Sequence, residues 1–579
     1  IKVRCLFFAV NPSGRIVRTN KKSQWAACSR SGFKEAFFNV VYEENKMKAK
    51  YMAAFHAALF TIASLFTGQL LAASEKAPEA DLMASTPGSM SAQDFIEYAS
   101  VNDEDIHELY FSTILYEGAE SCLMCHKKEG MAALQMGHFK WEGKSNRVSG
   151  LEGEIIGKNN LLNNFCIAVP TNEGRCTQCH AGIGYADKTF DFEDPANVDC
   201  LICHDQSGTY SKAPTTAGAP PPTVDLNVVA QSISMGAEPQ RKNCINCHAK
   251  AGGGDNVKHG DISTDLIATT REYDVHMGTD GANLKCTACH GANHNPEDGS
   301  YNHGNAGMSL HSIYEGEMKQ CDDCHGSQST IHASTAANPM FEQGWHERLA
   351  CQVCHIPAIA RKISTKTEWY WSDAGQDKEA PIDPDTGRPT YDKKKGTFVW
   401  KNNVRPVLRY SNGVWDRKVI NKTDGYDAEP IQLAVPHGDY NDPDAMIYPF
   451  KMMVGNQVVD PVNKTVMVPH LFGGKGGPNP YWAKYDWNLA LQDGSAYTGQ
   501  PYSGEYTFAE TEMLLSVNHE VAPAEQALGY GPMPDACTDC HSTEYVDWDE
   551  LGWTDDPLNG GDRVTAPSAP AVIAAPPSR

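Results

Sequence analysis

Sixteen of the 19 cysteines form eight pairs with the spacing Cys-x-x-Cys, and a histidine follows every pair directly. Two thiols at this spacing can bond the two vinyl groups of a haem, and the adjacent imidazole can then bind its iron. Zinc sites and disulfide scaffolds give no reason for a histidine after every pair. The sequence therefore predicts eight covalently attached c-type haems. The motifs are Cys122, Cys125 and His126; Cys176, Cys179 and His180; Cys200, Cys203 and His204; Cys244, Cys247 and His248; Cys286, Cys289 and His290; Cys321, Cys324 and His325; Cys351, Cys354 and His355; and Cys537, Cys540 and His541.

The other histidines are numerous enough to supply a second axial ligand to most haems. Of 21 histidines, eight belong to motifs and His56 lies in the expected signal peptide. Two histidine ligands per iron suit low-potential electron transfer and leave no open site. The twelve candidates are His107, His138, His259, His276, His294, His303, His311, His332, His346, His437, His470 and His519.

The N-terminal region carries the pattern of a secretory signal. The first methionine is Met47, and a short basic start and an apolar stretch over residues 51–66 follow it. This pattern predicts a signal peptide over residues 47–73, with residues 1–46 as upstream translated sequence. An uncleaved membrane anchor is the alternative, but polar residues dilute the stretch. We expect export to the periplasm and no stable membrane span after cleavage.

The charge balance limits the class of partner. The chain has a formal charge of -23, and residues 1–72 hold 11 basic and 3 acidic residues, so the remainder carries -31. A strongly acidic chain does not attract nucleic acid. An anionic substrate therefore needs a local positive pocket.

The spacing of the motifs predicts a mainly α and irregular multihaem cytochrome c, with a haem-packed core and one long haem-free insert between haems seven and eight. Seven motifs are packed so closely that only short helices and loops fit around them. Helices are expected over 94–115 and 508–528. The expected parts are an acidic leader (74–121), a seven-haem region (122–355), the insert (356–536), which ends in the second helix, the eighth haem (537–564) and a disordered Pro/Ala-rich tail (565–579).

One acidic cluster could bind calcium. Asp439, Asp442 and Asp444 supply three carboxylates within six residues. A solvated turn is the alternative that this composition favours.

Several segments resemble the octahaem tetrathionate reductase-type cytochromes, over most of the chain from His107 to His541. The layout of seven motifs, a long insert and an eighth motif also fits. Two features depart from the family: it usually has Trp-Asp-Trp where this chain has Trp-Tyr-Trp, and the leader matches poorly. The segments are 137–143 (GHFKWEG), 163–166 (NNFC), 258–261 (KHGD), 354–357 (CHIP), 369–375 (WYWSDAG) and 448–451 (YPFK).

The resemblance implies that the second haem, held by Cys176, Cys179 and His180, is the active site. It implies Lys258 as the sixth ligand of that haem, and an amine binds iron only when it is deprotonated. It also places Cys166, the one cysteine of the expected mature chain outside a motif, in the same pocket, together with Asp255. Seven histidines then complete the other haems, with His294 or His311 as substitutes for His303. The seven are His107, His138, His276, His303, His332, His346 and His519.

The resemblance implies a periplasmic reductase that splits a small oxyanion such as tetrathionate into thiosulfate. A redox partner cytochrome or a quinol-linked donor would supply the electrons. Nitrite or hydroxylamine conversion is an alternative, although no Cys-x-x-Cys-Lys motif is present. A pure electron carrier with eight saturated haems is another, because the spare histidines suffice for it.

Overall fold

The computed structural model describes residues 105–291, 318–335, 337–342, 346–541 and 545–564, with 8–10, 16–18, 93 and 96. The chain divides into two units, Ile1–Ala80 and Asp81–Arg579. In the first unit, β1 (Phe8–Val10) pairs antiparallel with β2 (Ile16–Arg18). The expected signal peptide, His294, His303, His311 and the expected tail lie outside the described residues.

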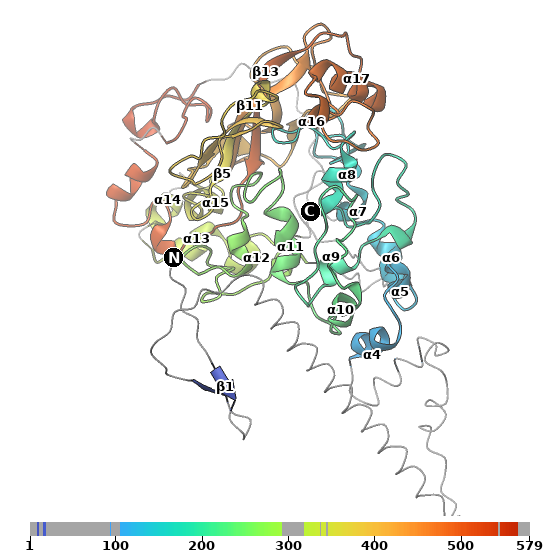
Figure 1. Ribbon diagram of the computed structural model, residues 1–579. Helices are drawn as coiled ribbons and strands as arrows, with labels where there is room; N and C mark the ends of the chain where they lie inside the picture. The colour runs from blue at the N-terminus through green and yellow to red at the C-terminus, as the bar shows by residue number, and fades with distance from the viewer. Residues whose placement is uncertain are drawn as a thin grey trace, which may run out of the picture. The chain divides into compact units, whose positions relative to one another are not determined.

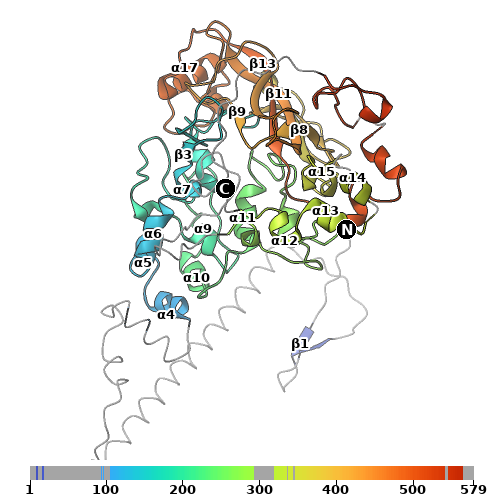
Figure 2. The ribbon, with the colours of Figure 1, turned by 180° about the vertical axis from the view of Figure 1, so that it is seen from behind.

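The motif-rich part of the second unit consists of short helices joined by loops (Figures 1 and 2). Asp105 begins α4 because its carboxylate accepts a hydrogen bond from the His107 N–H. A hairpin of β3 (Glu142–Ser145) and β4 (Glu154–Gly157) interrupts the helices. The helices are α4 (Ile106–Thr113), α5 (Ala119–Leu123), α6 (Lys127–Ala133), α7 (Gly137–Lys140), α8 (Glu173–Cys176), α9 (Leu201–His204), α10 (Leu226–Gln231), α11 (Arg241–His248), α12 (Asp322–His325), α13 (Gln328–His332), α14 (Asn338–Glu342) and α15 (Cys351–His355).

The insert folds into a nine-stranded mixed sheet, which the expectation of a mainly α and irregular fold missed. Its longest strand, β11, pairs antiparallel with β13 and parallel with β5. Two helices follow β12: α16 (Tyr481–Lys484) and α17 (Trp487–Thr498), which begins at the Asp486 cap and ends at Gly499. The strands are β5 (Thr365–Tyr370), β6 (Tyr391–Asp392), β7 (Gly396–Lys401), β8 (Val407–Ser411), β9 (Trp415–Arg417), β10 (Ile431–Pro436), β11 (Met446–Asp460), β12 (Thr465–Val466) and β13 (Thr507–Ser516).

The expected helix over 508–528 is wrong, because most of its first half forms β13. Its Glu, Met and Leu residues favour a helix locally. In the fold, β13 pairs with β11 from Val459↔Thr507 to Phe450↔Ser516, and this tertiary pairing overrides the local preference. Among the described residues of the expected helix over 94–115, Ile96 and α4 are helical.

The sheet is anchored to the segment that precedes the second motif. The buried Asn164 side chain donates to the carbonyls of Met453 (2.5 Å) and Thr511 (3.3 Å), on two neighbouring strands. The Trp371 indole donates to the carbonyl of Phe165 at 3.3 Å. These bonds join segments about 200 to 350 residues apart, so the sheet fixes the backbone next to Cys166.

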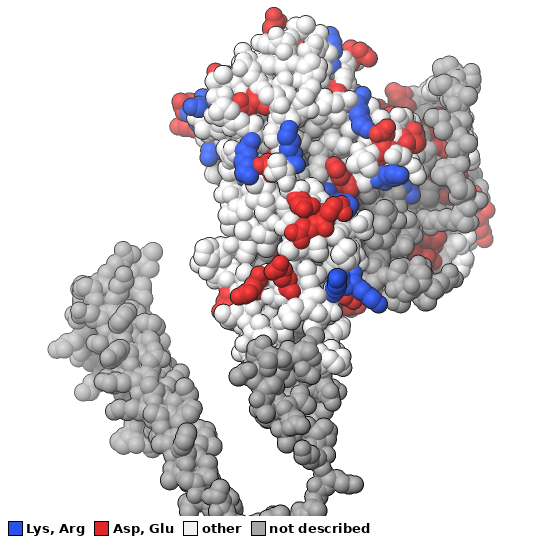
Figure 3. Space-filling view, turned by 90° about the vertical axis from the view of Figure 1, so that its right-hand side faces the viewer, with Lys and Arg blue, Asp and Glu red and all other residues white. Residues whose placement is uncertain are grey.

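Acidic side chains intersperse with isolated basic ones on the face shown in Figure 3. Within the part of the chain that the structure describes, no helix is long and apolar enough to span a bilayer.

Candidate haem sites and the Lys258 pocket

Six of the seven histidines expected as sixth ligands lie beside the histidine of a motif. The ring centroids are 5.9 to 6.4 Å apart in all six pairs. The pairs join the first, fourth, fifth, sixth, seventh and eighth motifs to a second imidazole. They are His107 with His126, His138 with His248, His519 with His290, His276 with His325, His332 with His355, and His346 with His541.

These separations fit an iron between the two rings. Metal to imidazole nitrogen distances of about 2 Å place the two centroids roughly 6 Å apart. Hydrogen bonds also orient several rings through Nδ1, which leaves Nε2 for the metal. The His519 Nδ1 lies 3.2 Å from Asp261, the His541 Nδ1 lies 2.7 Å from Asp556, and the His332 Nδ1 lies 2.8 Å from the Gln328 carbonyl.

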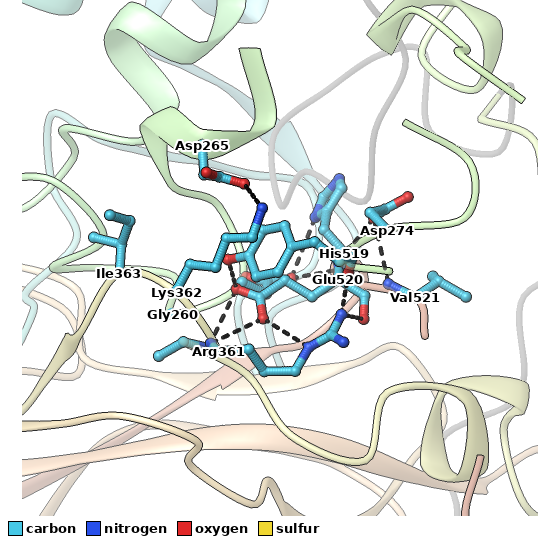
Figure 4. A network of polar contacts seen from close by, with 12 residues as sticks. Gly260, Asp265, Asp274, Arg361, Lys362, Ile363, His519, Glu520 and Val521 are labelled. Carbon is cyan, nitrogen blue, oxygen red and sulfur yellow. Dashed lines mark hydrogen bonds and ion pairs between the residues drawn. The ribbon is translucent and has the colours of Figure 1, made fainter. Parts of the chain in front are cut away.

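A buried polar network fixes the loop that carries His519 (Figure 4). The Glu520 carboxylate accepts from the Tyr273 hydroxyl at 2.5 Å and from the Arg361 guanidinium at 3.4 Å. Asp274 accepts from the N–H groups of Glu520 and Val521 at 3.0 and 3.3 Å. The side chain and the backbone of Glu520 are therefore both held, and this restricts the movement of the neighbouring His519.

Cysteines of different motifs lie next to each other and join all eight motifs into one array. Each contact joins two motifs, so attached haems would be neighbours in the same order. The second motif joins this array through the fourth motif, where Cys179 lies next to Cys247. The neighbouring cysteines are Cys122 with Cys200, Cys179 with Cys247, Cys244 with Cys286, Cys321 with Cys351, Cys203 with Cys244, Cys289 with Cys324, and Cys354 with Cys540.

The fourth motif has two candidate partners. The His248 centroid is 5.9 Å from that of His138 and 6.4 Å from that of His259. Burial lowers the pKa of His248 to about 3 and that of His259 well below its usual value, so both rings are neutral and able to bind a metal. His259 was not among the seven expected ligands. Its place next to Lys258 in the sequence is the only signal that could have marked it.

The histidine of the second motif lies in a cluster of aromatic side chains. The buried His180 ring packs against Phe139, Trp141 and Tyr185, and its Nε2 contacts the Phe139 carbonyl. Burial lowers the pKa of His180 to about 3. No histidine ring is stacked on it among the residues that the structure describes.

A buried ion pair lies directly behind the second motif. The Lys212 amine donates to the carbonyls of His180 (2.5 Å) and Gly182 (2.9 Å) and lies 2.8 Å from the Asp199 carboxylate. Asp199 also accepts from the Tyr210 hydroxyl at 2.6 Å. The three N–H groups of the ammonium are thus matched by three acceptors.

Lys258 ends a glycine-rich loop that the sheet holds in place. Gly252 has a φ of +82°, and a side chain there would press on Val257. The Lys451 amine on β11 donates to the carbonyls of Val257 (2.7 Å) and Lys258 (3.0 Å) and fixes the end of the loop. Lys451 lies in one of the segments that carry the family resemblance, but its role was not foreseen.

Lys258 is half-buried, and its amine lies in an electropositive environment. Burial, together with the nearby charges of Lys158 and Arg417, lowers its pKa to about 7. Its Nζ is 5.9 Å from the centroid of the Phe165 ring. Lys158 also lowers the pKa of His180, so one cation neighbours both the second motif and Lys258. No direct contact joins Lys258 to His180 within the described residues.

Cys166 lies against the same loop. Its Sγ is 3.9 Å from the Gly252 carbonyl, and its charge would raise the pKa of the Cys176 thiol. The Asn163 side chain accepts from the Cys166 N–H at 2.9 Å and sets the turn. Burial raises the pKa of Cys166 itself, so the sulfur is held mainly as a thiol.

Asp255 and the acidic cluster that could bind calcium both make local hydrogen bonds. The Asp255 carboxylate accepts from the N–H (3.0 Å) and hydroxyl (2.5 Å) of Thr264, which fixes the loop from its far end. Asp439 and Asp442 accept from backbone N–H groups of their own turn. No group of three or more metal-binding side chains occurs among the described residues, and calcium remains a prediction.

The protein has relatives that share this architecture. A family model described as "Cytochrome c bacterial" matches residues 366–544. The crystal structure of an octaheme cytochrome c from Shewanella oneidensis superposes with a TM-score of 0.66 and 36% identity, over 79% of this chain and 99% of that one. The chain belongs to the octahaem cytochromes c. The family implies covalently attached c-type haem, and an octahaem neighbour agrees with eight attachment motifs.

This octahaem cytochrome also has a more distant relative. An uncharacterised protein of Archaeoglobus fulgidus is 27% identical over 226 residues, which cover 31% of this chain and 75% of the relative. Its name adds nothing about the reaction.

Proposed function

We propose that this octahaem cytochrome is a periplasmic reductase with its active site at the second motif, where it reduces a small oxyanion such as tetrathionate. The observation that carries this proposal is the exceptional environment of Lys258. Six motif histidines face a second imidazole, whereas the second motif is next to a cationic pocket that contains an amine and a thiol.

The chain supplies ligands, charge and position. Cys176, Cys179 and His180 would hold the active haem, and the deprotonated Lys258 amine would be its displaceable sixth ligand. When bound, the haems supply the electrons. Lys258 in its charged form stabilises the negative charge of the substrate, and Cys166 presents its sulfur to the same pocket.

The reaction is balanced without protons. Tetrathionate takes up two electrons, its central S–S bond breaks, and two thiosulfate ions leave. Because no proton is consumed, Asp255 serves the reaction as a hydrogen-bond partner of the loop rather than as an acid. The electrons come from a partner cytochrome or a quinol-linked donor outside this chain.

A turnover assay tests the proposal. The purified holoprotein is supplied with a reduced viologen dye under anaerobic conditions, and tetrathionate, nitrite and hydroxylamine are compared at equal concentration. We expect tetrathionate to be consumed with two thiosulfate ions formed per molecule. Turnover of nitrite or hydroxylamine but not of tetrathionate would indicate an enzyme of nitrogen chemistry. If none of the three compounds oxidises the reduced protein, a pure electron carrier is favoured.

A further inference from the structure

Three segments bring cationic side chains together around Lys258. Backbone hydrogen bonds join the segment after β4 to the segment after β9, from the Leu162 N–H to Lys418 and from the Ile420 N–H to Asn160. The glycine loop that ends at Lys258 lies against the first of these segments through Cys166. These bonds and this contact bring the segments that carry Lys158, Lys258 and Arg417 side by side, and the charges of Lys158 and Arg417 act on the Lys258 amine.

Among the described residues, none of these three cations has a carboxylate partner. The Nε of Arg417 is buried and has no hydrogen-bond acceptor there. Within the part of the chain that the structure describes, Lys158 contacts only the Trp141 ring at 4.3 Å, and Lys258 only approaches the Phe165 ring. In a chain with 72 acidic and 49 basic residues, carboxylates are plentiful, so their exclusion from this place is a specific property of the fold.

The strand geometry explains why Asp416, the preceding residue in the sequence, does not neutralise Arg417. Adjacent residues of a strand point to opposite faces. Asp416 is exposed and pairs with His437 at 2.9 Å, so it faces away from Arg417. Lys418, also on the opposite face, donates to the Gly425 carbonyl at 2.5 Å.

We infer that Arg417 and Lys158 form an anion clamp that binds the oxyanion end of the substrate beside Lys258. Arg417 supplies a planar guanidinium, which can donate two parallel hydrogen bonds to one oxyanion group. Lys158 is exposed and stands at the rim, where it attracts the incoming anion through an otherwise acidic field. This inference rests on the proposed reduction of a small oxyanion, and it names the residues that would select that oxyanion.

A neighbouring cavity does not suit the same anion. It has a volume of about 340 Å³ and is lined in part by Glu142, Asn159, Glu173 and Tyr497. Two carboxylates in its wall would repel a dianion. A haem propionate is a second kind of anion that Arg417 could bind, and the experiment below separates it from the substrate.

The test measures binding on the oxidised holoprotein without an electron donor. Tetrathionate is titrated by calorimetry into the parent and into the variants Arg417→Gln, Arg417→Lys and Lys158→Gln, with Lys418→Gln as the matched control. Removal of a charge-assisted hydrogen bond weakens affinity by about 10- to 100-fold. We expect that loss for Arg417→Gln, a smaller loss for Lys158→Gln, partial recovery for Arg417→Lys and no change for the control.

Potentiometric titration of the same variants separates the two anions. A shifted haem midpoint in Arg417→Gln with unchanged tetrathionate affinity would assign the guanidinium to a propionate and overturn the clamp. Absence of tetrathionate binding by the parent, or equal affinity in parent, Arg417→Gln and Lys158→Gln, would also overturn it. If Arg417→Gln weakens binding while the parent does not turn over tetrathionate, the clamp stands and the proposed reaction fails.

Discussion

The protein treats its buried and half-buried cations in two different ways. Next to the second motif, Lys212 has three acceptors, one of them a carboxylate at 2.8 Å. Beside the His519 loop, Arg361 pairs with the buried Glu520 at 3.4 Å. At the glycine-rich loop, by contrast, Lys258 and Arg417 have no such partner in the described part of the chain. Folding alone favours paired or solvated charges, because an unpaired buried charge costs several kcal/mol.

The difference separates support from function. Paired cations hold backbone that carries a motif histidine or a candidate ligand, as Lys212 does at the His180 carbonyl. Unpaired cations keep their hydrogen-bonding capacity for a group that is not part of the chain. Substitutions in the two places should therefore affect different properties.

The largest expected effect is on stability, at Lys212. Lys212→Met leaves the buried Asp199 carboxylate without its cation, which should cost about 3–5 kcal/mol of the free energy of unfolding. Chemical denaturation followed by haem absorbance measures it. Lys378→Met is the control, because Lys378 pairs with Asp373 on the surface and its loss should cost about 1 kcal/mol or less. Equal stability losses in the two variants would erase the distinction between the two kinds of cation.

Cys166 lies against the loop that carries the unpaired Lys258, so its substitution should affect function rather than stability. Cys166→Ser should keep the haem absorbance spectra and the unfolding midpoint but lower tetrathionate turnover by about tenfold, since sulfur is the more nucleophilic and polarisable atom. Steady-state kinetics with a viologen donor measure this. Unchanged turnover would make Cys166 a packing residue against the Gly252 loop.

Asp255 is expected to behave as a structural residue. Asp255→Ala removes two acceptors from Thr264 and should cost about 1–2 kcal/mol of stability. Asp255→Asn retains one acceptor and should keep turnover within about threefold. If Asp255→Asn abolishes turnover while the unfolding midpoint stays constant, the carboxylate takes part in the reaction after all.

The smallest expected stability change is at Arg417. Because its guanidinium has no carboxylate partner to lose among the described residues, Arg417→Gln should leave the free energy of unfolding within about 1 kcal/mol of the parent, or raise it. Chemical denaturation of Arg417→Gln beside Lys212→Met measures the contrast directly. A loss as large as that of Lys212→Met would mean that Arg417 is a supporting cation.

The sequence predicted what depends on local spacing. Eight attachment motifs follow directly from it, and six of the seven histidines chosen as sixth ligands lie beside a motif histidine. The nine-stranded sheet was missed because β13 contains strong helix formers and becomes a strand only through pairing with β11.

The pocket depended on contacts that no local pattern encodes. Arg417 and Lys158 are 259 residues apart and carry no motif, and His259 competes with His138 for His248 only in three dimensions. Lys258, Cys166 and Asp255 entered through the family resemblance. Their separation into a pocket amine, a pocket thiol and a loop-capping carboxylate comes from the fold.

Low-temperature EPR of the oxidised holoprotein tests the amine-ligated site most directly. The parent should show one low-spin haem signal distinct from those of the bis-histidine haems. Lys258→Ala should remove that signal alone and replace it with a high-spin or water-ligated one, because no histidine stacks on His180 among the described residues. Identical spectra for parent and Lys258→Ala, with bis-histidine signals only, would contradict the Lys258 site and favour a pure electron carrier.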